Sequence, residues 1–179
     1  MHKKQVEASH YINSEYDIKE RFISYWHQID EIRKCKPKKI LEIGVGNGFV
    51  SQYLRQRGFS ITTVDFDKEL KPDIVADICN LPITDNSYDV VVCFEVLEHI
   101  PYNDALKGLY ELQRVSSKWV LVSLPDCHRY FHLDFKLPFI GQRRFLQKSP
   151  RQDIHEQIFD GQHYWEIGKK GYELKRIIE

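Results

Sequence analysis

Short apolar runs alternate with longer segments of helical periodicity along most of this chain. The runs at 38–44, 60–65, 73–77, 88–95 and 118–124 have the length and the composition of buried strands. Apolar positions recur at helical spacing at 13–34, 49–58 and 104–115, and Gly58 supplies a stop signal for the second of these helices. Strands and helices that alternate in this way predict an α/β fold, with a doubly wound, mostly parallel sheet covered on both faces.

Two regions interrupt the alternation. The helix at 13–34 precedes the first strand and is broken by Pro37, which predicts an N-terminal helical segment over residues 1–36. Residues 125–165 are aromatic and basic, with no acid between Asp134 and Asp153. A connection this long is usually a functional lid or disordered, so we expect a lid-like insertion after the fifth strand, over one end of the sheet. The remaining pattern predicts a single domain over residues 1–179, because domains most often hold roughly 100 to 200 residues.

The composition indicates which kinds of binding partner and which cellular compartment to expect. Lysine plus arginine and aspartate plus glutamate both number 26, so overall charge indicates neither nucleic acid nor a membrane as partner. The four cysteines are scattered without a CxxC pair, which is typical of reduced thiols rather than of a disulfide framework. The first residues lack the apolar core of a signal peptide, and no apolar run approaches the roughly 18 residues needed to span a bilayer. The sequence therefore predicts a soluble, cytoplasmic protein, and it does not indicate the oligomeric state.

The stretch ILEIGVGNG places Gly44, Gly46 and Gly48 at the first strand-to-helix turn. Glycine there lets the backbone approach a ligand and adopt dihedrals that other residues resist. Asp65 ends the second strand, about 20 residues beyond the glycines, where an acid can bind both ribose hydroxyls of a nucleotide. A tight turn without a ligand is the alternative, because short glycine motifs also occur by chance.

The residues around the turn indicate which class of nucleotide ligand would fit. A dinucleotide motif would need glycine where Phe49 stands, and the GK-Ser/Thr sequence of a phosphate-binding loop is absent. Glu42 lies just before the first glycine and suits a ligand with an ammonium and a sulfonium centre, because opposite charges attract. The sequence therefore predicts S-adenosylmethionine as the cofactor.

Three motifs occur in an order and spacing that resembles the class I S-adenosylmethionine-dependent methyltransferases, of the small-molecule type called methyltransferase type 11. They are ILEIGVGNG, VDFD and VADICNLPITDNSYDVVVCFEVLEHI, and the resemblance covers residues 38–125. It implies a Rossmann-like sheet of strand order 3-2-1-4-5, finished by an antiparallel hairpin of strands six and seven. No sequence after Glu179 could supply that hairpin, so we expect a chain that lacks the C-terminal strands.

The resemblance also implies roles for individual residues. Glu42 and the three glycines would contact the methionine part of the cofactor, and Asp65 would bind the ribose. The further contacts that it implies are Phe66 against the adenine, Asp77 on the adenine amine, Ile78 on the adenine ring, and Phe94 and Glu95 below the activated methyl group.

Methyl transfer from a sulfonium mainly requires alignment of the nucleophile and exclusion of water, so a dedicated base is optional. His99 is the candidate base, because it follows the fourth strand at the reacting end and imidazole titrates near neutral pH. A packing role without proton transfer is the alternative interpretation.

The remaining histidines raise the question of a metal. His128 and His132 are four residues apart, a spacing at which a helix can bind zinc, and His155 and His163 follow. No third ligand or HExxH acid accompanies the pair, so the sequence predicts no metal site.

These patterns favour an enzyme that transfers a methyl group from S-adenosylmethionine to a small-molecule acceptor, with no membrane partner. An RNA methyltransferase is one alternative, because arginines and aromatics in the insertion could contact phosphates and stacked bases. The balanced charge of the chain argues against RNA. A non-catalytic protein that binds S-adenosylmethionine is the other alternative.

Overall fold

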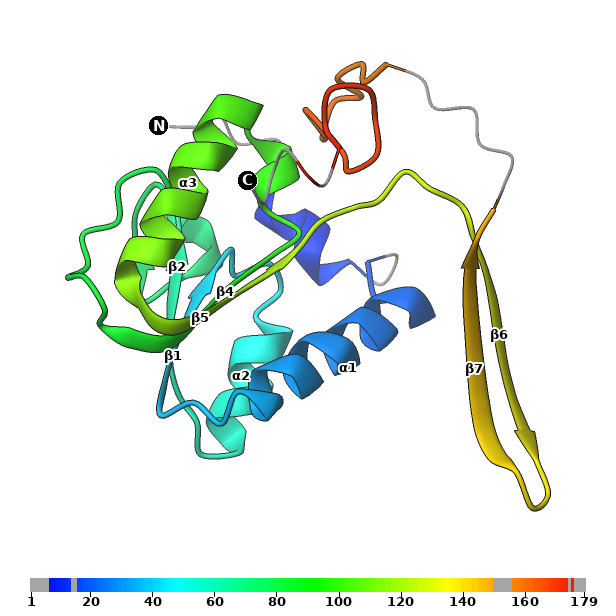
Figure 1. The fold of residues 1–179 in the computed structure, drawn as a ribbon. Coiled ribbons are helices and arrows are strands. Elements are labelled where there is room, and N and C mark those ends of the chain that lie inside the picture. The colour runs from blue at the N-terminus through cyan, green and yellow to red at the C-terminus, as the bar shows by residue number, and fades with distance from the viewer. Residues whose placement is uncertain (1–6, 14–15, 150–155, 174, 176–179) are drawn as a thin grey trace.

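The computed structural model of the chain describes residues 7–13, 16–149, 156–173 and 175. Its centre is a five-stranded sheet of order β3-β2-β1-β4-β5, and every neighbouring pair of strands in it is parallel (Figure 1). The strands are β1 Lys39–Ile43, β2 Ser60–Asp65, β3 Ile74–Val75, β4 Tyr88–Phe94 and β5 Ser116–Ser123. The doubly wound α/β fold and its strand order are thus confirmed.

Helices cover both faces of this sheet (Figure 1). On one face lie α1 (Lys19–Lys34) and α2 (Phe49–Gln56), and on the other lies α3 (Tyr102–Val115). Three short 3₁₀ helices lie in the connections: η1 Ala8–Ile12, η2 Lys68–Leu70 and η3 Leu97–His99. The central strands β1 and β4 are therefore largely buried on both faces, which is why they read as apolar runs rather than as alternating patterns.

Strand β1 shows how the two faces divide the core. Ile40 packs in the cluster that contains the buried side chains of α1 and α2, whereas Leu41 and Ile43 pack in the cluster that contains those of α3. Successive side chains of a strand point to opposite faces, so Glu42 lies on the same face as Ile40. This parity turns the carboxylate of Glu42 toward the side of α2, at the end of the sheet where the site forms.

The predicted N-terminal helix was wrong at its start. It begins at Lys19 rather than at residue 13, because the backbone at Ile18 is extended (φ −84°, ψ 159°). The buried side chains of α1 are Tyr25, Ile29 and Ile32, whereas Trp26, an apolar position of the predicted pattern, is 56% exposed.

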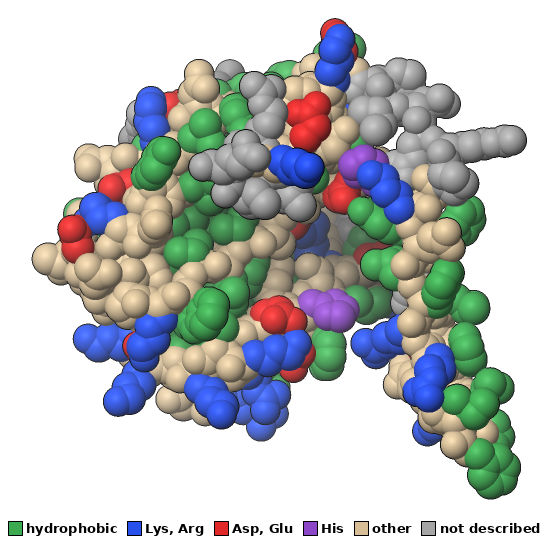
Figure 2. Space-filling model, in the orientation of Figure 1, with side chains coloured by type: hydrophobic (Ala, Val, Ile, Leu, Met, Phe, Trp, Pro, Cys, Tyr) green, Lys and Arg blue, Asp and Glu red, His purple; other side chains and the backbone are tan. Residues whose placement is uncertain are grey.

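The expected insertion contains a β-hairpin. Strands β6 (Tyr130–Leu137) and β7 (Gly141–Lys148) pair antiparallel in a sheet of their own, and the hairpin extends away from the rest of the chain (Figure 1). Figure 2 shows hydrophobic side chains along it, interspersed with Lys and Arg. A lid function for the insertion stays a prediction, as do the single-domain boundaries and the missing C-terminal strands. The last helical pattern of the sequence falls mostly outside the described residues.

No helix among the described residues has both the length and the apolar character needed to cross a membrane.

The segment that follows the insertion returns to the sheet and is fixed there by Trp165. This side chain is 1% exposed, and its Nε1–H donates to the carbonyls of Leu97 and Ile100, at 3.0 and 3.2 Å. The backbone N–H of Tyr164 donates to the carbonyl of Glu98 at 2.8 Å. These contacts hold residues 163–166 against η3, at the carboxyl end of β4.

Trp165→Phe is expected to lower the free energy of unfolding by about 2 kcal/mol, because two buried carbonyls lose their donor and part of the indole volume is left empty. Urea denaturation measures the change. Trp119→Phe is the matched control, since Trp119 is 56% exposed and its replacement should change stability by less than about 0.5 kcal/mol. Equal losses in the two variants would refute the anchoring role of Trp165.

Candidate active site

The carboxyl ends of β1, β2 and β4 open into a cavity of about 440 Å³, a size typical of small-molecule sites. Most of the residues that the sequence singled out line it, although they come from four separate stretches of the chain. These lining residues are Glu42, Gly44, Gly46, Asp65, Phe66, Asp77, Ile78, Phe94, Glu95 and His99. Gly48 is the predicted contact that does not line the cavity.

The glycine turn brings bare backbone to the cavity wall. Gly44 and Gly46 have φ of +84° and +54°, a region that favours glycine. A Cβ added to Gly44 would lie 2.3 Å from Cγ2 of Val96, whereas one on Gly46 would meet nothing closer than 3.9 Å. Gly48 is instead the N-cap of α2, in left-handed backbone with φ +73°, so the helix start explains that glycine.

Asp65 joins the glycine turn to the end of β2. Its Oδ2 accepts the backbone N–H of Val45 and its Oδ1 accepts that of Asp67, both at 2.9 Å. Each carboxylate oxygen can accept a second hydrogen bond, and the side chain lines the cavity. Burial raises the pKa of Asp65, and the backbone hydrogen bonds oppose that rise.

Glu42 is a buried carboxyl group with a vacant acceptor. The residue is 5% exposed, and its Oε2 has no hydrogen-bond partner among the described residues. Burial raises its pKa to about 7, while Ser51 and Arg55 pull the pKa down. A buried acceptor of this kind is unfavourable until a donor reaches it, and the cavity is the side from which a ligand's ammonium can do so.

Glu42→Gln is expected to flatten the dependence of stability on pH. Because the folded-state pKa of about 7 exceeds the ordinary value of 4.5, the folded state binds more protons between those values. In the unmodified protein this group should therefore lower the free energy of unfolding by about 2 kcal/mol between pH 5 and pH 7. The Glu42→Gln variant should not show this fall, because glutamine does not titrate. Urea denaturation at several pH values, with the exposed Glu31→Gln as control, measures it. Parallel curves for Glu42→Gln and the unmodified protein would contradict a buried carboxyl.

Comparisons with known proteins give the family. The methyltransferase domain family matches residues 41–119. The ubiquinone biosynthesis O-methyltransferase of Pseudomonas aeruginosa (strain LESB58) is 32% identical over 167 residues, covering 84% of this chain and 71% of that protein. This chain belongs to the class I S-adenosylmethionine-dependent methyltransferases. Its cofactor is S-adenosylmethionine.

Further relatives agree with this assignment. The protein of the same name from Pseudomonas entomophila (strain L48) is 33% identical over 141 residues, covering 69% of this chain and 58% of the relative. Two solved structures share the fold of this methyltransferase. One is from Pyrococcus horikoshii OT3, with a TM-score of 0.53, 17% identity, and 75% and 77% coverage of the two chains. The other is an S-adenosylmethionine-dependent methyltransferase from Aquifex aeolicus, with a TM-score of 0.51, 16% identity, and 67% and 74% coverage.

The cofactor fits the residues that this methyltransferase presents. The turn at Gly44 and Gly46 leaves no side chain between backbone and cavity, and the vacant Oε2 of Glu42 is an acceptor for an ammonium group. Asp65 keeps acceptor capacity for hydroxyl groups. Apart from Gly48, the predicted contacts thus line one cavity.

Sequence reasoning missed the aromatic side chains of the N-terminal segment. Tyr11 and Tyr16 line the cavity of the methyltransferase, and their rings meet edge to face with centroids 5.4 Å apart. Burial raises the pKa of Tyr11 to about 12. Tyr25 of α1 donates from its hydroxyl to Oδ1 of Asn47 at 3.1 Å, which ties the segment to the glycine turn. Tyr11 precedes the first predicted element, and Tyr16 falls in the helix predicted at 13–34, whereas α1 begins only at Lys19. No pattern in the sequence therefore placed either ring at the cavity.

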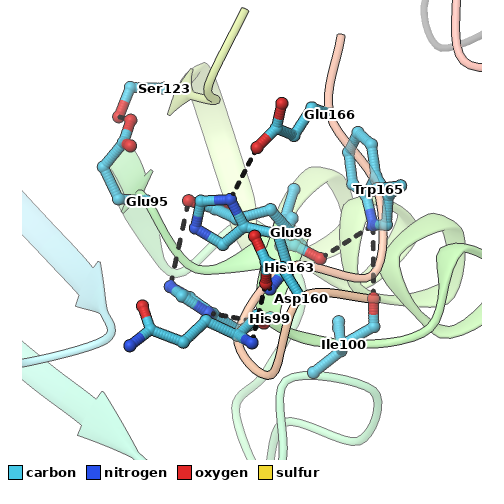
Figure 3. A network of polar contacts seen from close by, with 11 residues as sticks. Glu95, Glu98, His99, Ile100, Ser123, Asp160, His163, Trp165 and Glu166 are labelled. Atoms are coloured by element: carbon cyan, nitrogen blue, oxygen red, sulfur yellow. Dashed lines mark hydrogen bonds and ion pairs between the residues drawn. The ribbon is translucent and has the colours of Figure 1, made fainter. Parts of the chain in front are cut away.

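The opposite end of the cavity collects side chains from η3 and from the segment after the insertion (Figure 3). His99 ends η3, its Nδ1 lies 3.1 Å from the carbonyl of Gln162, and burial lowers its pKa. Its role as a base stays a hypothesis. Glu95 has φ +54°, and its Oε1 accepts the hydroxyl of Ser123 at 2.7 Å. Strain in a non-glycine residue at a cavity wall is typical of a functional position.

The other histidines of the sequence analysis separate in space. His163 lines the cavity. His128 contacts the carboxylate of Asp126 through its Nδ1. His132 belongs to strand β6, and His155 lies outside the described residues. The structure thus pairs His163 with His99, a partner that the histidine spacing did not indicate.

Proposed function

We propose that this methyltransferase acts on a hydroxyl group of a small-molecule acceptor. The observation that carries the proposal is the cavity itself, which joins the cofactor wall to the residues around His99 in about 440 Å³. Side chains from both ends of the chain line this pocket. A pocket of this volume suits a small acceptor better than a polymer. Oxygen as the nucleophilic atom is suggested by the name of the relatives, which are O-methyltransferases.

We assign the cofactor contacts along the wall already described. Asp65 would bind the ribose hydroxyls, Glu42 the ammonium group, and the backbone at Gly44 and Gly46 the methionine part. The remaining assigned contacts are Phe66, Asp77 and Ile78 at the adenine, and Phe94 and Glu95 at the methyl end. When bound, S-adenosylmethionine supplies a methyl group on a positively charged sulfur.

The contribution of the protein is alignment and the exclusion of water. Tyr11 and Tyr16 close the cavity from the N-terminal side, and His163 closes it from the segment after the insertion. We infer that the acceptor lies between these side chains, beside η3. His99 lies there, where a base could receive the acceptor's proton.

Two measurements test the function. Calorimetry with S-adenosylmethionine and S-adenosylhomocysteine should show binding of both ligands. A screen of hydroxylated small molecules and of total RNA, read by mass spectrometry of the methylated product, should give a product in the small-molecule arm. Product only from RNA would refute the small-molecule proposal, and binding without any product would favour a non-catalytic role.

A further inference from the structure

Glu98 is the least satisfied buried group in the part of the chain that the structure describes. The residue is 0% exposed, and neither carboxylate oxygen has a hydrogen-bond partner there. A buried carboxyl group without donors is destabilising, so its presence at the cavity calls for a ligand that supplies positive charge.

Two imidazoles lie beside this carboxyl group (Figure 3). Nε2 of His99 is 4.0 Å from Oε1 of Glu98, and the rings of His99 and His163 have centroids 5.1 Å apart. One ligand atom from each of the three residues lies within 4.8 Å of the others. Two ligand atoms on opposite sides of one ion, each with a bond of about 2.1 Å, lie about 4.2 Å apart. The three ligand atoms are therefore close to the spacing that an ion requires, and small shifts of the side chains would let all three bind it.

The other nitrogen of each imidazole has an orienting partner. Nδ1 of His163 lies 2.9 Å from Oε1 of Glu166, and Nδ1 of His99 lies 3.1 Å from the carbonyl of Gln162. Hydrogen bonds of this kind place the proton on Nδ1 and the lone pair on Nε2, which is the arrangement of metal-binding histidines. Trp165 and the backbone of Tyr164 hold this segment against η3, so the three residues are fixed by the fold.

We propose that Glu98, His99 and His163 bind a divalent transition-metal ion at the acceptor end of the cavity. The histidine spacing predicts no metal site, because spacing along the chain does not reveal that His163 returns to Glu98. Two imidazoles and one carboxylate suit Mn²⁺, Fe²⁺, Co²⁺ or Zn²⁺, and they leave coordination positions open toward the cavity. A neighbouring triad, Asp126, Cys127 and His128, is less suited, because its carboxylate already accepts from His128 and Tyr130.

An ion bound by these three residues would lie where the acceptor is proposed to bind, which suggests a role in the methyl transfer. This part of the inference rests on the proposed function. An acceptor hydroxyl bound to the ion would lose its proton to solvent at lower pH, as metal-bound water does, and would be held at the methyl end of the cavity. A nitrogen bound to the ion cannot accept a proton, so His99 would act as a ligand rather than as the base.

Metal binding can be measured without activity. After treatment with a chelator and its removal, the chain is titrated with Co²⁺ alone and with Zn²⁺ alone, using visible absorption and calorimetry. We expect one equivalent of each metal to bind, with Co²⁺ absorption bands of a low-symmetry site. Glu98→Gln and His163→Gln should weaken binding at least about 100-fold, and Glu166→Gln about 10-fold, because Glu166 only orients a ligand. The control His27→Gln changes an exposed histidine of α1 and should bind as the unmodified chain does.

The possible results distinguish a failure of the metal site from a failure of the proposed function. Calorimetry with S-adenosylhomocysteine on the chelator-treated chain reports the cofactor wall alone, and circular dichroism reports folding of each variant. Cofactor-product binding without metal binding would overturn the metal site and leave the methyltransferase proposal intact. Equal metal affinity in folded Glu98→Gln and the unmodified chain would also overturn it. Metal binding that depends on Glu98 and His163 would support the site even if no acceptor were methylated.

Discussion

Asp65→Ala is expected to weaken the binding of S-adenosylhomocysteine by about 100-fold. We assign the carboxylate to the two ribose hydroxyls, and hydrogen bonds to a charged group contribute roughly 1.5–3 kcal/mol each. The loss of both therefore corresponds to at least about 3 kcal/mol of binding free energy, or two orders of magnitude in Kd. The change also removes the acceptor for the N–H groups of Val45 and Asp67, which should loosen the glycine turn. Calorimetry measures the affinity.

Asp73→Ala is the matched control for this change. Asp73 also binds β2, because its Oδ2 accepts the backbone N–H and the hydroxyl of Thr63, at 2.7 and 2.9 Å. It does not line the cavity. Its removal should lower stability by about 1–2 kcal/mol while the affinity changes less than about threefold. An affinity for Asp65→Ala as high as that of the control would refute the ribose contact.

Gly44→Ala is expected to lower the free energy of unfolding by about 3 kcal/mol. Left-handed backbone costs a residue with a Cβ about 1 kcal/mol, and φ here is +84°. The added Cβ would also lie 2.3 Å from Cγ2 of Val96, and overpacking of this kind costs roughly 1–3 kcal/mol. Valine has little freedom to rotate away, because branching at Cβ restricts its side chain. Urea denaturation measures the loss.

Gly58→Ala separates the two contributions. Gly58 has the same φ of +84°, but a Cβ there would meet nothing within 4 Å. Its replacement should therefore cost only the backbone part, about 1 kcal/mol. Val96→Ala combined with Gly44→Ala removes the clashing methyl group and should recover part of the loss. Equal losses at Gly44 and Gly58, or no recovery in the double variant, would contradict the close approach.

The sequence by itself determined the order of the elements, and all the predicted contacts except Gly48 line the cavity. Strand and helix periodicities are local properties, since each records which side chains of one element face the core. The acids at 42 and 65 lie at the carboxyl ends of β1 and β2, and the glycines at 44 and 46 follow β1. The parallel sheet therefore carries them to one edge wherever else the chain runs. Gly48 has a local role instead, as the start of α2.

Tertiary packing alone decided the rest of the site. Tyr11 and Tyr16 reach the cavity from the segment before α1, and Trp165 brings His163 to Glu98 from beyond the hairpin. A residue pattern specifies the faces of its own element, but it does not specify which distant segment will cover them. The burial of Glu98 with no hydrogen-bond partner among the described residues is likewise a property of several segments packed together. The cavity residues at the strand ends could therefore be predicted from the sequence, and the proposed metal site could not.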